Sequence, residues 1–291
     1  MNVVGPALGM MFAVCLAAAS LFSRRGLNRA PFDLLLVTTL AVAAPLYLLL
    51  AAVTVGFDGM PRHGLLLAAV GAVLGSVLGR SLYLLGIKFV GPGKSLSINA
   101  VSLPIAATLS TVALGEPLTP LVVGGTLVIT VGVVAIARDG RREADRAGRS
   151  RAVLLVPLVS ACFIASAVVV RKAALSTGLD PIHAGTVNMV VALSVAAPVV
   201  GAYRGRDLLT VDRWALRQFL VASLLMAVGF VAYFVGLELT RANVFFPLVQ
   251  TQPLFAVVFS ASLARDLEVL TRWTGGGAVA VMAGAVLVVL G

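Results

Sequence analysis

Long apolar stretches separated by short polar segments run through the whole chain. An α-helix needs about 20 apolar residues to cross the ~30 Å hydrocarbon core of a bilayer. Most of the stretches have that length, and the shorter third one continues through Arg80 to Ile87. The pattern therefore predicts an all-α membrane protein with ten membrane-spanning helices. The stretches without Asp, Glu, Lys or Arg are 1–23, 34–57, 64–79, 95–115, 117–137, 152–170, 184–203, 218–237, 242–264 and 273–291.

Two other interpretations of these stretches fit less well. Strands of a membrane β-barrel alternate polar and apolar residues, whereas these stretches do not. The positive charge of a cleaved signal peptide precedes its apolar core, but Arg24 and Arg25 follow residues 1–23. We therefore expect a first span that is retained.

The composition and the distribution of charge support a membrane protein. Hydrophobic residues make up 60% of the 291 residues and charged residues only 12%, against roughly 45–50% and 25% in soluble domains. The net charge of +10 suggests nucleic-acid binding, but the positive residues lie in loops. The loops after the odd-numbered spans hold 17 Lys and Arg, and those on the other side hold 4. The positive-inside rule then places the basic segment 138–151 in the cytoplasm and both termini outside, in the cell membrane.

The chain contains an internal repeat. Gly79, Tyr83 and Gly86 recur 150 positions later. Similar spacings relate Pro6 and Phe12 to Pro157 and Phe163, and Ala43–Pro45 to Ala196–Pro198. We predict a first repeat over 1–137, a linker over 138–151 and a second repeat over 152–291. Because each repeat has five spans, the second must enter the membrane from the opposite face, as in the inverted repeats of many secondary transporters.

Prolines and glycines inside the spans indicate breaks and close packing. Proline removes a backbone donor and kinks a helix, and such breaks persist where protein or a wet cavity satisfies the freed carbonyls. Gly71, Gly75 and Gly79 lie four residues apart, which predicts a packing face for a neighbouring helix. Each proline alone is equally well a tolerated kink, but their pairing across the repeat favours shared architecture. The predicted helix breaks are Pro45, Pro104, Pro198 and Pro253.

The stretch YLLGIKFVGPGKSLSINAVSLPIAATLSTVALGEPLTPLVVGGTLVITVGVVAIA (83–137) resembles the carboxy-terminal part of an EamA repeat of the drug/metabolite transporter superfamily. Its features are a central proline, Pro104, and a Gly-Glu turn, Gly115-Glu116, before the last helix. Residues 233–270 form a degenerate second copy with Arg265-Asp266 at the turn. We interpret Glu116 as a surface residue of a tight hairpin. The resemblance implies a permease with a central cavity between two repeats. Ten-span relatives generally resemble a termini-inside arrangement, so the charge bias predicts the inverted orientation.

Arg80 is the one charge that we place well inside a span, and its counterpart in the repeat is Phe230. An unpaired arginine there costs about 2.5–3.5 kcal/mol on insertion scales. It either extends to the interface or faces the cavity, where a guanidinium binds a carboxylate or phosphate. We favour the cavity, with an anionic or zwitterionic substrate. No acid lies mid-span, which disfavours proton antiport of cationic drugs.

Polar side chains of the fourth and ninth spans are further candidates for substrate binding. Neutral polar groups in a span need partners on neighbouring helices or on a ligand. Asn99 and Gln250 are the hardest to satisfy locally, whereas the tyrosines are equally plausible as interface anchors. The full set of predicted substrate-binding residues is Arg80, Tyr83, Asn99, Ser102, Asn188, Tyr233, Gln250 and Gln252.

The function we predict is secondary transport of a small polar metabolite, amino-acid-like or organic-acid-like, by alternating access and in the direction of export (efflux). The alternatives are a phosphate-ester or nucleotide-sugar exchanger, which would need several buried basic residues, and a non-transport membrane scaffold. The spans hold no constellation of nucleophile, base or metal ligands, so we expect no enzyme, no cofactor and no metal. The expected partners are a small-molecule substrate and the lipid bilayer, with no nucleic acid, and the chain acting as a monomer or homodimer.

Overall fold

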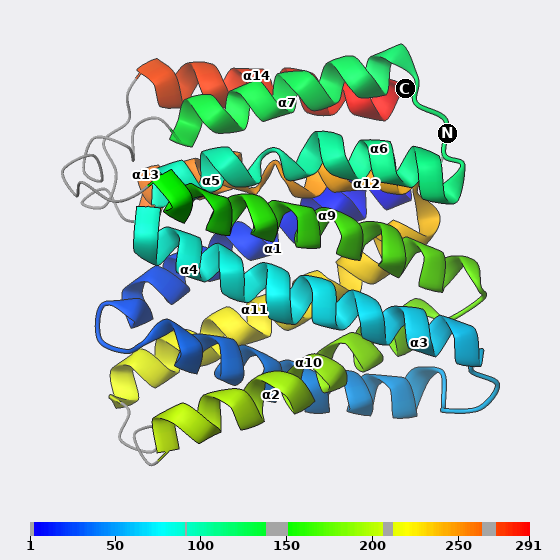
Figure 1. The fold of residues 1–291 in the computed structure, drawn as a ribbon, viewed down its shortest axis with the longest axis vertical. Helices are drawn as coiled ribbons and strands as arrows, with labels where there is room; N and C mark the ends of the chain where they lie inside the picture. The colour runs from blue at the N-terminus through cyan, green and yellow to red at the C-terminus, as the bar shows by residue number, and fades with distance from the viewer. Residues whose placement is uncertain (1–2, 91, 138–150, 206–211, 264–271) are drawn as a thin grey trace.

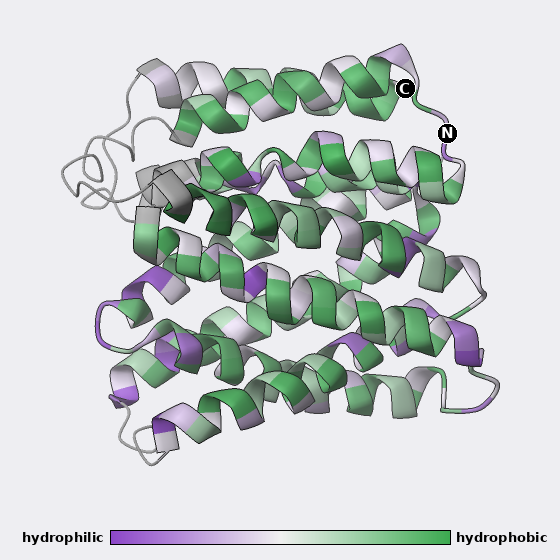
Figure 2. Ribbon diagram, in the orientation of Figure 1, coloured by the Kyte–Doolittle hydropathy of each residue, from purple (hydrophilic) through white to green (hydrophobic). Residues whose placement is uncertain are grey.

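The computed structural model describes residues 3–90, 92–137, 151–205, 212–263 and 272–291. All regular structure in these ranges is helical, and seven segments of at least 18 residues are apolar enough to cross a membrane. Two shorter apolar helices and one broken helix complete the ten predicted spans. Hydrophobic residues follow the lengths of the helices, and hydrophilic residues gather at their ends (Figure 2). The fold class predicted from the sequence is confirmed, while the predicted linker 138–151 lies almost wholly outside the described residues.

Each repeat contributes five spans. In the first, the third span runs through α3, the π-helix η1 and α4, and the fourth consists of α5 and α6. In the second, the ninth span consists of α12 and α13. The bounds in the first repeat are α1 Val4–Leu27, α2 Phe32–Thr54, α3 Arg62–Gly71, η1 Ala72–Gly79, α4 Arg80–Val90, α5 Pro92–Asn99, α6 Ser102–Leu114 and α7 Pro120–Ala137. Those in the second are η2 Arg151–Leu154, α9 Leu155–Ser176, α10 Pro181–Arg204, α11 Arg213–Leu239, α12 Ala242–Val249, α13 Gln252–Leu263 and α14 Arg272–Leu290.

The packing of the helices follows an inverted repeat. Helix α1 packs against α11, and its counterpart α9 packs against α3, η1 and α4, the counterpart of α11. The second spans, α2 and α10, pack against each other, and so do the fifth spans, α7 and α14. In Figure 1 these two self-paired sets form the outer layers, with the other helices between them. The two repeats therefore interlock through equivalent contacts.

The α7–α14 pair is packed backbone to backbone. A Cβ atom added to Gly125 would lie 2.7 Å from the carbonyl oxygen of Gly284, and one added to Gly132 would lie 2.8 Å from that of Gly277. No side chain fits there, so the two helices approach each other along a track of glycines spaced seven residues apart on each helix. This pair forms one edge of the bundle (Figure 1).

Two faces of the bundle bear the loops. Helix α1 begins and α14 ends at one face, which we call the terminal face (Figure 1). Loops 55–61, 115–119, 177–180 and 240–241 also lie at the terminal face, whereas loop 28–31 lies at the opposite face. Local signals set these ends: Gly115 ends α6 with a left-handed φ of 68°, and the Asp180 carboxylate accepts the Ile182 amide to begin α10.

Candidate functional site

The fourth and ninth spans are both broken near their midpoints, at 100–101 and 250–251. The breaks lie 150 positions apart, which is the repeat spacing, and they face each other across the two repeats. Gln250 Nε2 donates a hydrogen bond to Ser102 Oγ over 3.4 Å. Two of the predicted substrate-binding residues thus meet at the midpoint of the bundle. Discontinuous helices of this kind surround the binding sites of inverted-repeat transporters.

The predicted prolines take two different positions. Pro104 and Pro253 lie in the first turns of α6 and α13, where a helix needs no amide donor. A break of the span therefore does occur where these two prolines predicted one, although it precedes each proline by a few residues and the proline itself lies in the new helix. The predicted breaks at Pro45 and Pro198 were wrong, because both prolines lie inside the continuous helices α2 and α10, which pack against each other.

Arg80 begins α4 directly after the π-helix η1, and π-helical turns are frequent at functional sites. Its side chain is half-buried, and Nη2 contacts the Met226 sulfur on α11 at 3.4 Å. It therefore reaches a helix of the other repeat. Thioether sulfur is a weak acceptor, and no acid in the described part of the chain pairs with Arg80.

A second buried arginine, Arg171, corrects our expectation that Arg80 is the one charge deep inside a span. Arg171 lies in α9, is 6% exposed, and donates from Nη2 to Ser76 Oγ at 2.9 Å and to Asn188 Oδ1 at 2.8 Å. Its Cζ atom also lies 5.6 Å from the centre of the Tyr233 ring. Asn188 Nδ2 in turn donates to Ser76 Oγ at 3.1 Å. We call Arg171, Ser76, Asn188 and Tyr233 the Arg171 cluster.

The sequence signal that was missed is the length of the sixth span. We ended that stretch at residue 170 because the run without charged residues stops there, and Arg171 and Lys172 were counted as loop charges. The helix continues to Ser176, so Arg171 is five residues, or about 7–8 Å, from its end. Gly178, with φ of 84°, and the Asp180-Pro181 helix start mark the true boundary.

The predicted glycine face on the third span is confirmed, and it makes room for this arginine. A Cβ atom on Gly75 would lie 2.7 Å from Arg171 Nη2, and one on Gly71 would lie 2.9 Å from Arg171 Cγ. One turn further on, a Cβ atom on Gly79 would lie 2.8 Å from Ile164 of α9. The third span therefore lets α9 approach closely and leaves space for a guanidinium between them.

Asn99 joins a separate polar chain. Its Nδ2 donates to Ser160 Oγ at 3.2 Å, and Ser160 Oγ donates to the carbonyl oxygen of Gly79 at 2.8 Å. Gly79 is the last residue of η1, so this chain ends beside Arg80. It therefore ties α5, α9 and the third span together.

The side chains of Tyr233, Tyr83 and Gln252 form no hydrogen bond with the described residues. Tyr233 is 3% exposed, lies among Phe12, Phe230, Phe234 and Phe245, and its hydroxyl has no hydrogen-bond partner among the described residues. Tyr83 is half-buried, and its backbone oxygen accepts a hydrogen bond from Ser95 Oγ at 3.5 Å. Gln252 is half-buried and forms no side-chain hydrogen bond within the described ranges.

Glu116 is buried, so our interpretation of it as a surface residue was wrong. It is 8% exposed, and its two carboxylate oxygens accept the amides of Ala242 at 2.7 Å and Asn243 at 2.9 Å. These are the first two amides of α12, and a negative charge at a helix N-terminus is stabilising. Its counterpart in the degenerate copy, Asp266, lies outside the described residues.

The end of α11, directly before α12, is held from another side. Lys172 Nζ donates to the carbonyl oxygens of Leu237 at 2.8 Å and Glu238 at 2.9 Å. A lysine that binds the last carbonyl groups of a helix stabilises its C-terminus. Glu116 and Lys172 thus fix the α11–α12 connection at the terminal face. The opposite face has its own contact between repeats, because Asp33 accepts Arg204 Nε at 2.6 Å and the Tyr203 hydroxyl at 2.9 Å.

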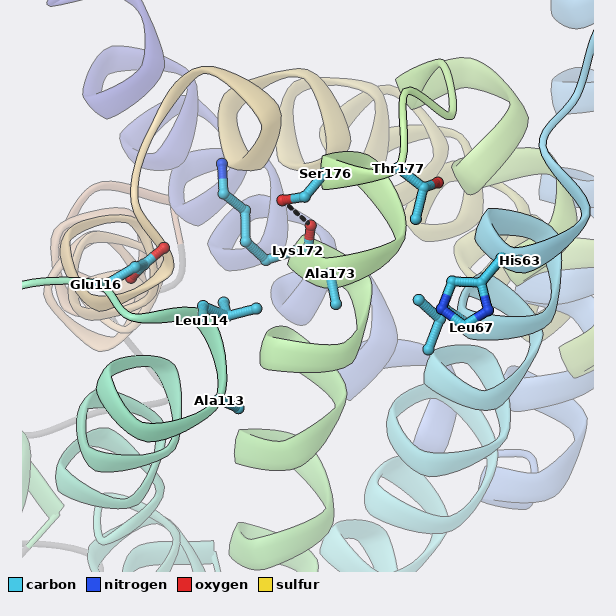
Figure 3. A pocket seen from close by; sticks show the side chains of 9 residues that line it. All are labelled: His63, Leu67, Ala113, Leu114, Glu116, Lys172, Ala173, Ser176 and Thr177. Carbon is cyan, nitrogen blue, oxygen red and sulfur yellow. Dashed lines mark hydrogen bonds between the residues drawn. The ribbon is translucent and has the colours of Figure 1, made fainter.

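A groove of about 470 Å³ opens at the terminal face between α3, α6 and α9. Glu116 and Lys172 lie on one side of it, and His63 and Leu67 on the other (Figure 3). None of the eight predicted substrate-binding residues lines this groove. On α9, Arg171 is buried in the cluster, whereas the next residue, Lys172, lines the groove.

Comparisons with known proteins agree with this architecture. A family profile described as "EamA-like transporter family" matches residues 3–138 and 150–290. No curated protein matches the chain. A solved structure described as "Crystal structure of protein" superposes with a TM-score of 0.78, covering 98% of each chain at 12% identity. At that identity the similarity shows the fold alone.

Proposed function

The chain belongs to the EamA-like transporter family, and on that basis we propose that it is a secondary transporter that moves a small polar metabolite across the cell membrane by alternating access. The observation that carries the proposal is the meeting of two broken spans from inverted repeats at Ser102 and Gln250. Freed backbone and amide groups at the midplane of such repeats bind substrates in this architecture.

We propose a substrate with a carboxylate, such as an amino acid or another organic acid. Arg80 supports this class because it is half-buried and forms no ion pair with a described acid. A guanidinium without a protein counter-charge is matched by an anionic group of the substrate. Export is the direction that we propose, and efflux from preloaded cells tests it.

A phosphate-ester or nucleotide-sugar exchanger is the second candidate. The sequence argued against it because only one buried basic residue was expected. Arg171 is a second one, which raises the positive charge available to a phosphate group. Phosphate esters therefore belong in any panel of test substrates.

The orientation that we propose places the terminal face outside the cytoplasm. Because Arg171 is buried in α9, it does not act as a loop charge, and the charge bias toward the opposite face is larger than the sequence count indicated. Single cysteines introduced at Gly59 and Asn28, labelled from outside intact cells in a variant without Cys15 and Cys162, test this. We expect labelling of the cysteine at position 59 and not of the one at position 28. Labelling at position 28 alone would show that the orientation is the reverse of the one we propose.

Counterflow in liposomes tests transport directly. Purified protein is reconstituted with unlabelled solute inside, and labelled amino acids, organic acids and phosphate esters are offered outside. We expect accumulation of a carboxylate-bearing solute. Arg80→Ala should lower its uptake about tenfold or more, because a hydrogen bond to a charged group contributes roughly 1.5–3 kcal/mol.

Arg62→Ala is the matched control, because Arg62 is exposed at the start of α3. If Arg80→Ala transports every anion as the parent does, Arg80 is not a substrate ligand. If no solute in the panel accumulates, the chain is better described as a membrane scaffold.

A further inference from the structure

Arg171 carries a positive charge that its protein neighbours do not neutralise. Its two hydrogen-bond acceptors, Ser76 and Asn188, are neutral, and no acid in the described ranges pairs with it. Three of the described acids have other partners: Asp33 binds Arg204, Glu116 binds the start of α12, and Asp180 begins α10. A fourth, Glu238, is exposed and interacts electrostatically with Lys172. A buried cation in hydrocarbon without a counter-charge is an unusual arrangement, and it marks ligand pathways.

Unused hydrogen-bond donors lie at the same place. Among the described residues, neither Arg171 Nε nor the Tyr233 hydroxyl has a hydrogen-bond partner, and both are buried; Arg171 Cζ lies 5.6 Å from the centre of the Tyr233 ring. An arginine nitrogen can only donate a hydrogen bond, and a tyrosine hydroxyl can donate one. A ligand that satisfies both groups must therefore be an acceptor, and one that also neutralises the charge must be an anion.

The surroundings favour a carboxylate over a phosphate. The cluster supplies one formal charge, two neutral polar groups and the aromatic faces of Tyr233 and Phe234, whose centres lie 5.6 and 5.9 Å from Arg171 Cζ. A phosphate monoester carries close to two negative charges at neutral pH, whereas a monocarboxylate matches a single guanidinium in charge and in planar geometry. A Cβ atom on Gly75 would lie 2.7 Å from Arg171 Nη2 and 2.8 Å from Ala167 Cβ, so the glycine allows the guanidinium to lie directly against the third span.

We propose that the Arg171 cluster is the principal anion site of this protein and binds the carboxylate of a monocarboxylate, with Arg171 and Tyr233 as its ligands. The inference rests on the proposed transport function and names its substrate class and its anchor. Ser76 and Asn188 position the guanidinium. Arg80 lies four residues beyond Ser76 on the same span, or about 6 Å along it. It is the second arginine that binds the anion in this proposal.

Ligand-induced stabilisation of the detergent-solubilised full chain tests the site without transport. The probes are acetate, butyrate and benzoate, each compared at constant ionic strength with its amide, and also inorganic phosphate and chloride. We expect a concentration-dependent rise in melting temperature with the carboxylates and none with the amides. Phosphate or chloride stabilising the protein more than any carboxylate would overturn the assignment.

Variants then locate the effect. Arg171→Lys keeps a charge but loses the planar group, and the apparent carboxylate affinity should fall about tenfold. Tyr233→Phe keeps the aromatic packing and removes only the hydroxyl, so it tests the site even if Arg171→Lys fails to fold. We expect it to weaken carboxylate binding severalfold. Arg62→Lys is the matched control. Unchanged affinity in Tyr233→Phe, or in a folded Arg171→Lys, would refute the proposal.

The two hypotheses fail in different ways. Counterflow of neutral solutes together with no carboxylate stabilisation would leave transport standing and remove the anion site. Carboxylate stabilisation that depends on Arg171, with no counterflow of any solute, would leave the anion site standing and remove the transport function.

Discussion

Two helix–helix interfaces, or crossings, are related by the internal repeat but differ in the polarity of their side chains. The third span and α9, which pack against each other, carry Ser76, Arg80, Ser160 and Arg171. Where α1 crosses α11, the equivalent positions at offsets of 150 and 151 are Met226, Phe230, Gly9 and Ser20. The first crossing is polar and charged, and the second is apolar and aromatic.

The residues that allow close helix packing recur in both crossings, whereas the polar and charged residues do not. Glycines occur at equivalent places in both crossings: Gly79 lies against Ile164, and its counterpart Gly229 lies against Cys15 and Phe12. Close helix packing is thus preserved in both copies, while the polar groups occur in one. A substrate has no two-fold symmetry, so a charge that binds it is needed on one side of the molecule.

Placing a charge in the apolar crossing should have the largest effect. Phe230→Arg puts a guanidinium among Phe12, Tyr233 and Phe234 and next to Met226, which Arg80 already contacts. We expect a loss of about 2.5–3.5 kcal/mol in unfolding free energy, the cost of an unpaired arginine within a span. Thermal unfolding in detergent measures it, with Phe230→Leu as the control. Equal stability of the two variants would show that this crossing tolerates charge as well as the other does.

Substituting the equivalent glycines should affect both crossings alike. Gly79→Ala places a methyl 2.8 Å from Ile164 Cγ1, and Gly229→Ala places one 2.9 Å from Cys15 Cβ. Each should cost about 1–3 kcal/mol, the usual effect of overpacking. Gly124→Ala is the control, because no atom lies within 4 Å of its added Cβ. A loss at only one of the two glycines would mean that the scaffold is less symmetric than the helix contacts indicate.

The smallest effect is expected from a single polar link in the charged crossing. Ser160→Ala removes the acceptor of Asn99 and the donor to the Gly79 carbonyl, which should lower the unfolding free energy by about 1 kcal/mol. Ser194→Ala serves for comparison, since that hydroxyl is exposed and bonds only to its own helix at Val190. If both serines can be replaced without loss, the Asn99–Ser160–Gly79 chain does not stabilise the crossing.

The sequence predicted the fold well because a membrane constrains it strongly. Each span must be apolar over its whole length, so runs without charge located the spans directly. The repeated Gly79, Tyr83 and Gly86 gave the symmetry. Prolines 104 and 253 signalled the broken spans, although the break itself precedes each proline by a few residues.

The candidate site was predicted only in part, because burial depends on partners far away in the sequence. Glu116 looked like a turn residue, and its partners Ala242 and Asn243 are 126 and 127 positions away. Arg171 was counted as a loop charge, but it packs against a glycine face about 100 positions earlier in the chain. The π-helix η1 has no sequence signature that we recognised. Asn188, Ser102 and Gln250 were identified because neutral polar residues are conspicuous inside apolar spans.

The glycine track between α7 and α14 has a consequence for how the chain is made. Synthesis proceeds from the N-terminus, so α7 enters the bilayer while α14 is still untranslated. Until α14 has also been inserted, the side of α7 bearing Gly125 and Gly132 lacks the helix that packs on it. This contact therefore forms only after the second repeat has been synthesised as far as α14.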